Sequence, residues 1–221
     1  MNYFEEWLKV IDKAELNKVT NILGRMYRNT PICPAQKDVF NAFKYCKLSD
    51  LKIVMIGQDP YPQINTATGI LFGNSKETPE ELLSPSLKII KEAVINFEMP
   101  HNCIIFDNSL LSWAKQGILM INGALTVEMN KIGSHTMLWR PFISKLLSNL
   151  SIYPGIIYVL FGKQAQTFEP YIKKNNYIIK VEHPAYFART NTKMPYKVFK
   201  DINDIMIKQY GETIKWYEEN G

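Results

Sequence analysis

Residues 51–62, Leu-Lys-Ile-Val-Met-Ile-Gly-Gln-Asp-Pro-Tyr-Pro, contain the pattern that decides the fold. The first six are almost all apolar, which is typical of a strand buried on both faces of a parallel sheet. The last six predict a tight turn, because Gly, Asp and Pro are common turn residues. The turn presents an amide, a carboxylate and a phenol, which suit a site for a small polar ring.

Three further apolar runs predict the rest of the sheet, at residues 117–122, 155–161 and 177–182. Helical periodicity separates or follows the runs, at 85–97, 138–150, 163–174 and 195–209. Strands that alternate with helices indicate a parallel sheet with right-handed crossovers. We therefore expect an α/β fold with a central four-stranded parallel sheet and helices on both faces.

Residues 1–47 have a different, helical pattern. One apolar stripe comprises Tyr3, Phe4, Trp7, Leu8 and Ile11, and a second comprises Leu16, Val19, Ile22, Leu23 and Met26. Pro34 suits the first turn of another helix. Because neither an internal repeat nor a low-complexity linker is present, we expect one domain over 1–221, with a helical part at 1–47 and an α/β core at 48–221.

The bulk composition excludes several classes of protein. A net charge of +5 permits a polyanionic partner without requiring one. The three cysteines have no CxxC spacing, which argues against a disulfide framework and for a reducing, intracellular and cytoplasmic location (Cys33, Cys46 and Cys103). The three histidines are too scattered to indicate a metal site (His101, His135 and His183). Neither a signal peptide nor a membrane-spanning run is recognisable.

Polar residues follow each of the four predicted strands. The segments are 58–61 (Gln-Asp-Pro-Tyr), 122–123 (Asn-Gly), 162–163 (Gly-Lys) and 182–184 (Glu-His-Pro). Ligands of open α/β sheets bind beyond the carboxyl ends of the strands. The sequence therefore predicts one site, at one rim of the sheet.

Three motifs on this rim resemble those of family 1 uracil-DNA glycosylases. The first is Gly57-Gln58-Asp59-Pro60-Tyr61, continuing to Phe72; the second is 121–127, Ile-Asn-Gly-Ala-Leu-Thr-Val, followed by Gly133-Ser134-His135; the third is His183-Pro184. Order and spacing hold from about residue 50 to the tail, where 214–216 (Ile-Lys-Trp) also resembles the family. The resemblance implies a monomeric, monofunctional DNA glycosylase that flips uracil out of DNA, hydrolyses its N-glycosidic bond and leaves an abasic site for base excision repair.

The resemblance implies neither a cofactor nor a metal. The expected partners are uracil-containing single- and double-stranded DNA and, as in the family, a DNA-mimicking acidic inhibitor protein.

The resemblance also assigns roles to the rim residues. Asp59 would act on the attacking water and stabilise the sugar cation, and His183 would stabilise charge on uracil O2. Asn122 would read the base edge, and Tyr61 would exclude a methyl group at C5. Phe72 would stack on the uracil ring, and Gln58 would bond a uracil carbonyl. Each role has a simpler alternative. Asp59 could cap a turn, His183 could bond the backbone, and Asn122 could be a turn residue. Tyr61 and Phe72 could simply pack in the core.

Expected DNA contacts fall on residues where this chain partly departs from the family. Those with predicted phosphate or backbone contacts are Ser86, Ser134, Lys163, Pro184, Ala185 and Arg189. Ala185 and Lys163 stand where the family has serine, and Pro62 stands where it has histidine. Phe187 stands where the family inserts a leucine into the duplex, and aromatic wedges do enter base steps. Helix caps are the alternative for the serines, and a solvated surface is the alternative for Arg189 with Lys193 and Lys197.

Three other functions remain open at this point. A glycosylase-like scaffold could bind DNA or a protein partner with little turnover, which the altered DNA-contact residues would allow. A glycosylase of broader specificity could accept thymine, although Tyr61 argues against it. A nucleotide or nucleoside hydrolase would act on free deoxyuridine.

Overall fold

The predicted four-stranded parallel sheet is confirmed. A computed structural model describes residues 4–98 and 104–219. Its central sheet has the order β4-β2-β6-β7, with bounds β2 (Ile53–Gly57), β4 (Ile118–Asn122), β6 (Ile157–Phe161) and β7 (Tyr177–Val181). All residues of β2, β4 and β6 are buried, which explains their unbroken apolar sequences.

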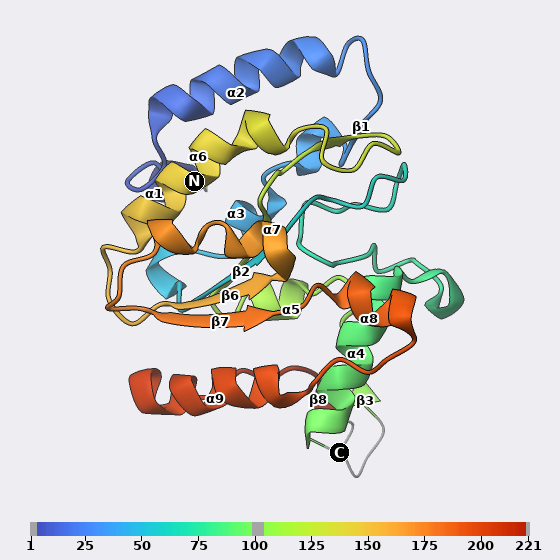
Figure 1. Cartoon of the computed structure of the whole chain (residues 1–221), viewed down its shortest axis with the longest axis vertical. Coiled ribbons are helices and arrows are strands. Elements are labelled where there is room, and N and C mark those ends of the chain that lie inside the picture. The colour runs from blue at the N-terminus through green and yellow to red at the C-terminus, as the bar shows by residue number, and fades with distance from the viewer. Residues whose placement is uncertain (1–3, 99–103, 220–221) are drawn as a thin grey trace.

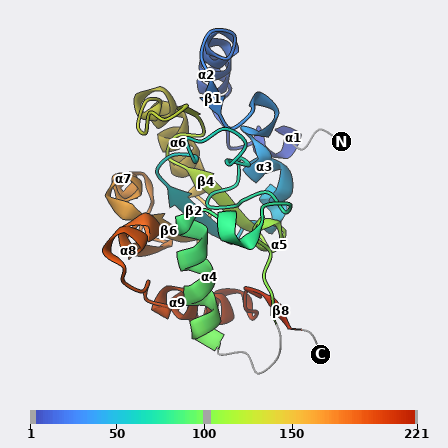
Figure 2. The same cartoon turned by 90° about the vertical axis from the view of Figure 1, so that its right-hand side faces the viewer.

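Helices cover both faces of the sheet (Figures 1 and 2). Helix α6 (Thr136–Leu150) lies over one face with α2 (Lys13–Met26) packed outside it, and α9 (Lys197–Tyr210) lies over the other. At the carboxyl ends of the strands, α4 (Pro85–Glu98) packs against α8 (Pro184–Thr190). The remaining helices are short: α1 (Phe4–Trp7), α3 (Asn41–Tyr45), α5 (Leu111–Ala114), α7 (Gly162–Gln166) and the 3-10 turns η1 (Gln36–Asp38), η2 (Leu48–Asp50), η3 (Glu80–Leu82) and η4 (Glu169–Tyr171).

The N-terminal part is only partly helical. Pro34 is not in a helical turn as predicted: it follows β1 (Ile32–Cys33), and the Cys33–Pro34 peptide bond is cis. Strand β1 pairs antiparallel with β5 (Val127–Glu128), and this pair ties the N-terminal part to the loop beyond β4. A second short pair joins β3 (Ile104–Ile105) to β8 (Glu218–Glu219). Tyr3, which belongs to the first predicted apolar stripe, lies outside the described residues.

Two helix predictions near the site need correction. The helix predicted over 163–174 is the five-residue α7 followed by η4, because Pro170 lacks an N–H and cannot continue an α-helix. Helix α8 was not predicted, although its start is recognisable: Pro184 occupies the first turn and His183 is the N-cap. Both helices begin directly after a strand, so they bring their N-termini to the same rim.

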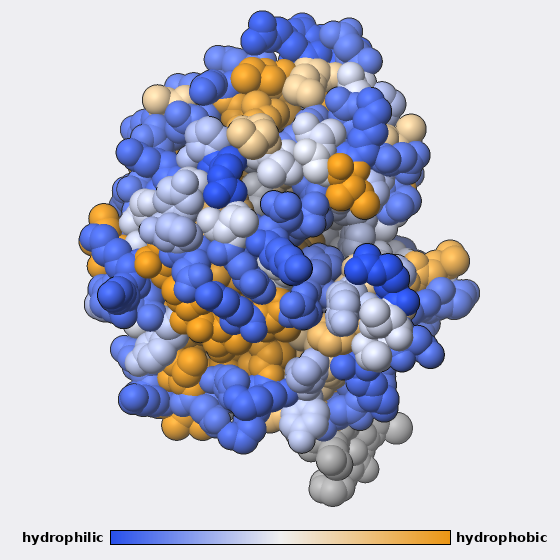
Figure 3. All heavy atoms as spheres, in the orientation of Figure 1, coloured by the Kyte–Doolittle hydropathy of each residue, from blue (hydrophilic) through white to orange (hydrophobic). Residues whose placement is uncertain are grey.

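The edge of the sheet at β7 is partly exposed. Figure 3 shows apolar side chains gathered between β7 and α9, within a mostly polar surface. Ile178 and Ile179 of β7 are half-buried, and Ile207 of α9 is exposed. Within the described ranges, no helix is both long and apolar enough to cross a membrane.

Candidate active site

A cavity of about 880 Å³ opens where the four strands end. The carboxyl ends of the strands face the viewer in Figure 2. Its lining includes all six residues predicted to bind uracil or to catalyse: Gln58, Asp59, Tyr61, Phe72, Asn122 and His183. They come from four separate segments of the chain. The parallel sheet brings them together because each follows or faces the carboxyl end of a strand.

Asp59 is held by two donors and keeps one free oxygen. Its Oδ2 accepts hydrogen bonds from the Gly133 backbone N–H (2.9 Å) and from Gln58 Nε2 (3.1 Å). Its Oδ1 is buried and accepts no hydrogen bond from the described residues. Burial raises the pKa of Asp59, and the two donors oppose that rise because they favour the ionised carboxylate. The free oxygen can accept a proton from a water molecule in the cavity.

Asn122 ends β4 directly beside Gly57, which ends β2. A Cβ added at Gly57 would lie 2.9 Å from Asn122 Oδ1, so the glycine leaves room for the amide. Asn122 is 7% exposed, and its Oδ1 has no hydrogen-bond donor among the described residues. A buried acceptor without a partner is costly in a folded protein, so this amide is set up for a ligand donor.

His183 has a defined tautomer. Its Nδ1 accepts a hydrogen bond from the Ala185 backbone N–H (3.2 Å), as the N-cap of α8. Nδ1 therefore carries no proton, and in the neutral ring the proton is on Nε2. Burial lowers the pKa of His183 to about 4, so the ring is neutral at physiological pH and offers Nε2–H as a donor.

Phe72 occupies a backbone conformation that its side chain disfavours. Its φ is +62°, in the left-handed region. The Tyr61 hydroxyl donates to the Phe72 carbonyl oxygen (3.0 Å), and the Phe72 ring has edge contacts with Phe161 and His183 at centroid distances of 5.1 and 5.4 Å. Burial raises the pKa of Tyr61, so the phenol keeps its proton. These contacts hold the Phe72 ring in the cavity wall.

The residues predicted to contact DNA are not equally accessible. Lys163, Ala185 and Arg189 are exposed and line the cavity. Ser86 also lines it but is only 4% exposed, and Pro184 is buried. Ser134 is exposed and lies outside the lining, where its Oγ accepts a hydrogen bond from the Glu128 N–H (2.9 Å).

Phe187, the predicted wedge, is only 8% exposed and belongs to the hydrophobic core. Tyr186 is 43% exposed, lines the cavity and packs its ring against Phe187 at 5.4 Å. Tyr186 was not identified from the sequence, because the helix α8 that carries it was not predicted. The helix start at Pro184 could have indicated that adjacent residues here point in different directions.

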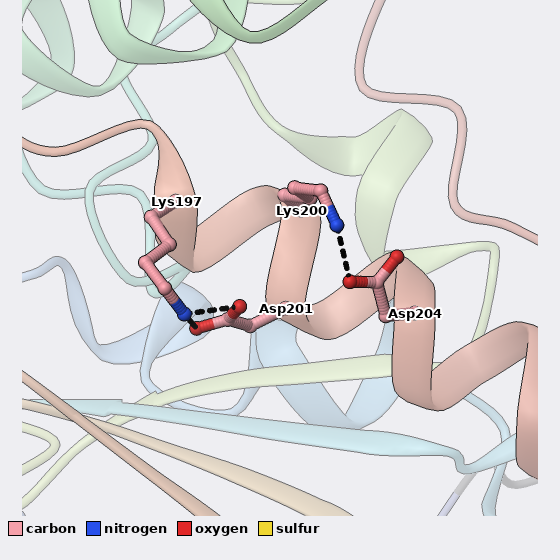
Figure 4. Close-up of polar contacts among 4 residues, drawn as sticks. All are labelled: Lys197, Lys200, Asp201 and Asp204. Atoms are coloured by element: carbon pink, nitrogen blue, oxygen red, sulfur yellow. Dashed lines mark hydrogen bonds and ion pairs between the residues drawn. The ribbon is translucent and has the colours of Figure 1, made fainter.

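The lysines beyond Arg189 have carboxylate partners. Lys193 Nζ lies 3.2 Å from Glu92 Oε1, and Lys197 Nζ lies 2.6 Å from Asp201 Oδ2. Figure 4 shows the second pair beside the parallel pair Lys200–Asp204 on α9. These surface pairs offset the basic charge predicted for this region. Over 4–98 and 104–219, no group of three or more side chains is arranged to hold a metal ion.

Comparison with known proteins identifies relatives across almost the whole chain. Residues 43–206 match the family model described as the Uracil DNA glycosylase superfamily. The chain is 34% identical over 219 residues to the uracil-DNA glycosylase of Buchnera aphidicola subsp. Acyrthosiphon pisum (strain Tuc7), covering 97% of this chain and 92% of the relative. It is also 34% identical to the uracil-DNA glycosylase of Mycoplasmopsis pulmonis (strain UAB CTIP), covering 98% of this chain and 99% of the relative.

A solved structure shares the fold. A variant of mimivirus UNG in complex with UGI superposes with a TM-score of 0.81 at 25% sequence identity, covering 97% of this chain and 87% of that one.

Proposed function

Because the chain belongs to the uracil DNA glycosylase superfamily, we propose that it excises uracil from DNA by hydrolysing the N-glycosidic bond, leaving an abasic site. The observation that best supports this is the pair of buried, unpartnered acceptors in one cavity, Asp59 Oδ1 and Asn122 Oδ1. One suits a water molecule and the other suits the edge of a base.

The cavity complements a flipped uracil. Asn122 Oδ1 accepts from uracil N3–H while its amide NH₂ donates to O4. Cytosine presents the opposite pattern, so it would leave both ends of the amide mispaired. Phe72 stacks on the ring, and Tyr61 blocks the position of the thymine methyl group.

Asp59 and His183 act on the two sides of the bond that breaks. The electron pair of the C1′–N1 bond leaves with uracil, and negative charge develops on the base. His183 Nε2–H donates to uracil O2 and stabilises that charge; losing such a donor costs about 2.7–4 kcal/mol. The sugar becomes an oxocarbenium-like cation beside Asp59. A water oxygen then attacks C1′ as its proton passes to Asp59.

The rim of the cavity provides the DNA contacts. Lys163 and Arg189 are exposed there and suit phosphates. Phe187 stays a predicted wedge, and the exposed Tyr186 is the alternative residue to fill the space that the flipped base leaves in a duplex. A mimivirus UNG variant was solved with UGI, and we extend to this chain the binding of a DNA-mimicking acidic inhibitor at the same basic rim.

We also propose that the protein works as a monomer in the reducing cytoplasm. The two described cysteines, Cys33 and Cys46, are free and buried, as expected of a protein that does not depend on disulfides. Cys103 lies outside the described residues.

The test is excision from oligonucleotides that carry one uracil, single-stranded and double-stranded, followed by alkaline cleavage of the abasic site. We expect cleavage at uracil with the intact protein and a loss of about 10²–10⁴-fold in kcat for Asp59→Asn. Tight DNA binding without cleavage would instead support the scaffold function. Cleavage at thymine or of free deoxyuridine would support the other two alternatives.

A further inference from the structure

A buried chain of hydrogen bonds lies beside the cavity without lining it. Trp139 Nε1 donates to Thr126 Oγ1 (2.7 Å), and Thr126 Oγ1 lies 2.8 Å from His135 Nδ1. Trp139 and Thr126 are fully buried, and His135 is 2% exposed. None of the three touches the space where uracil is proposed to bind.

The hydrogen-bond partners fix which atoms carry the protons between Trp139, Thr126 and His135. Thr126 Oγ1 already accepts from Trp139, and among the described residues His135 Nδ1 is the acceptor available to its hydroxyl hydrogen. His135 Nδ1 is therefore unprotonated, and the proton of the neutral ring is on Nε2. Burial lowers the pKa of His135, although nearby Glu128 opposes the effect, and a lowered pKa agrees with a neutral ring.

His135 directly follows a turn that contacts Asp59. The turn runs through Lys131 and Ile132 to Ser134, all of which are exposed, and His135 is the next buried side chain. Gly133, inside this turn, donates its backbone N–H to Asp59 Oδ2 (2.9 Å). Hydrogen bonds between Glu128, Lys131 and Ser134 hold the turn together internally, and His135 is the buried side chain that joins its end to the core.

We propose that His135, held by Thr126 and Trp139, is a positioning residue that keeps the Gly133 N–H against the Asp59 carboxylate. This inference rests on the proposed function, in which Asp59 acts on the attacking water. His135 touches neither uracil nor the reacting atoms; it acts through the turn.

Loss of the anchor has a specific consequence for Asp59. The Gly133 N–H favours the ionised carboxylate and opposes the rise in pKa that burial causes. If the turn moves, Gln58 remains the one side-chain donor to Asp59, and the carboxylate becomes harder to ionise. A displacement of about 1 Å in a catalytic group can cost about 10²-fold in rate. The effect falls on the chemical step, since uracil contacts other residues.

A matched pair of substitutions at Thr126 tests this inference. Thr126→Val keeps the shape of the side chain and removes the hydroxyl that holds His135, whereas Thr126→Ser keeps the hydroxyl. On a single-stranded uracil oligonucleotide, Thr126→Val should lower kcat by about 10–100-fold, with KM within about twofold if binding is untouched. The acid limb of its pH–rate profile should move to higher pH. Thr126→Ser should keep both the rate and the acid limb of the unmodified protein.

Two further measurements separate positioning from folding and from the function itself. Thermal unfolding shows that each variant is folded at the assay temperature. A ¹³C NMR titration of the Asp59 carboxyl carbon reports its pKa without any turnover and should shift upward in Thr126→Val alone. Equal losses in both variants, or an unshifted Asp59 titration in Thr126→Val, would overturn the positioning role. Absence of uracil excision by the unmodified protein would reject the proposed function and leave the NMR test intact.

Discussion

Removal from water disfavours the charged form of both proposed catalytic side chains, Asp59 and His183. Burial disfavours charge, so it raises the pKa of Asp59 and lowers that of His183. The difference between them lies in their partners. Asp59 has two N–H donors that favour the anion, whereas His183 accepts a backbone N–H at Nδ1, which favours the neutral ring. Local hydrogen bonds thus give one charged and one neutral group in one cavity.

The partly buried, neutral His183 makes the free energy of unfolding depend on pH. Its pKa in the folded protein is about 4, against an ordinary value of 6.5, so the unfolded chain binds more protons between these values. The contribution of His183 to the free energy of unfolding should therefore be fully present above pH 6.5 and should be lost as the pH drops toward 4. We expect the free energy of unfolding of the His183→Gln variant to fall less between pH 6.5 and 4, as measured by urea denaturation at pH 7, 5.5 and 4. Parallel curves for the two proteins would contradict the assignment of the neutral ring.

The Tyr61 hydroxyl should support the strained backbone at Phe72. Tyr61→Phe keeps the ring that we propose to block the thymine methyl group but loses the hydrogen bond to the Phe72 carbonyl oxygen. A hydrogen bond of this kind contributes about 0.5–1.5 kcal/mol. We expect a lower free energy of unfolding and weaker uracil binding, with thymine still rejected. Denaturation and inhibition by free uracil measure the two effects.

Tyr158→Phe is the matched control for this prediction. The Tyr158 hydroxyl is also buried but has no hydrogen-bond partner in the described structure, so its removal should leave stability unchanged or raised. Equal destabilisation by both substitutions would mean that the Tyr61 hydroxyl has no special role.

Two strand ends depend on glycines that adjoin the site. Besides Gly57, Gly162 directly follows β6 and begins α7 with φ +81°, and a Cβ there would lie 2.9 Å from His183 Cβ. Gly162→Ala should therefore displace His183 and lower kcat/KM by about 10²-fold.

Gly24→Ala provides the control, because a Cβ at that position of α2 would have no atom within 4 Å apart from its chain neighbours and the backbone of its own helix. It should leave activity unchanged and stabilise the protein by about 0.5–1 kcal/mol. Excision kinetics and thermal unfolding of both variants test the comparison. An active Gly162→Ala variant would show that the close approach is unimportant.

The edge strand β7 should be protected from pairing with other chains by Lys180. Lys180 lies among partly exposed apolar residues of β7 and pairs with Glu169 at 2.6 Å. Charged residues on edge strands discourage edge-to-edge association. We expect Lys180→Ile to increase self-association, measured by light scattering against protein concentration, whereas Lys180→Arg should leave it unchanged.

The central sheet could be predicted from the sequence because strands buried on both faces must be apolar throughout. The position after those strands pointed to Asp59, Asn122 and His183, whereas Phe72 follows no strand and came only from the resemblance to the family. Short elements could not be predicted, since β1 pairs with β5 across more than 90 residues and two-residue strands carry no periodicity. The exposure of Tyr186 and the burial of Phe187 depend on how α8 packs against α4, which is a tertiary property.

The N-terminal helical part shares the core of the α/β part. Trp7 is fully buried in the same hydrophobic cluster as the central strands, Asn149 Nδ2 donates to the Val10 carbonyl oxygen (2.8 Å), and α2 packs on α6. We therefore propose that residues 1–221 form one domain, in which the two parts unfold together.

Denaturation of the whole chain tests this proposal. Tryptophan fluorescence and far-UV circular dichroism should give coincident transitions, as a two-state domain does. Trp7→Ala should lower the stability of the whole protein by about 3–5 kcal/mol. Two separated transitions, with only one affected by Trp7→Ala, would show that the N-terminal part is an independent unit.

The placement of the cavity at four strand ends also bears on synthesis of the protein. Asp59, Asn122 and His183 lie at or after the ends of three different strands, far apart in the sequence. During synthesis the carboxylate is made first, the amide second and the imidazole last. A nascent chain that has not yet reached residue 183 therefore cannot form the proposed site, however well its first strands have folded.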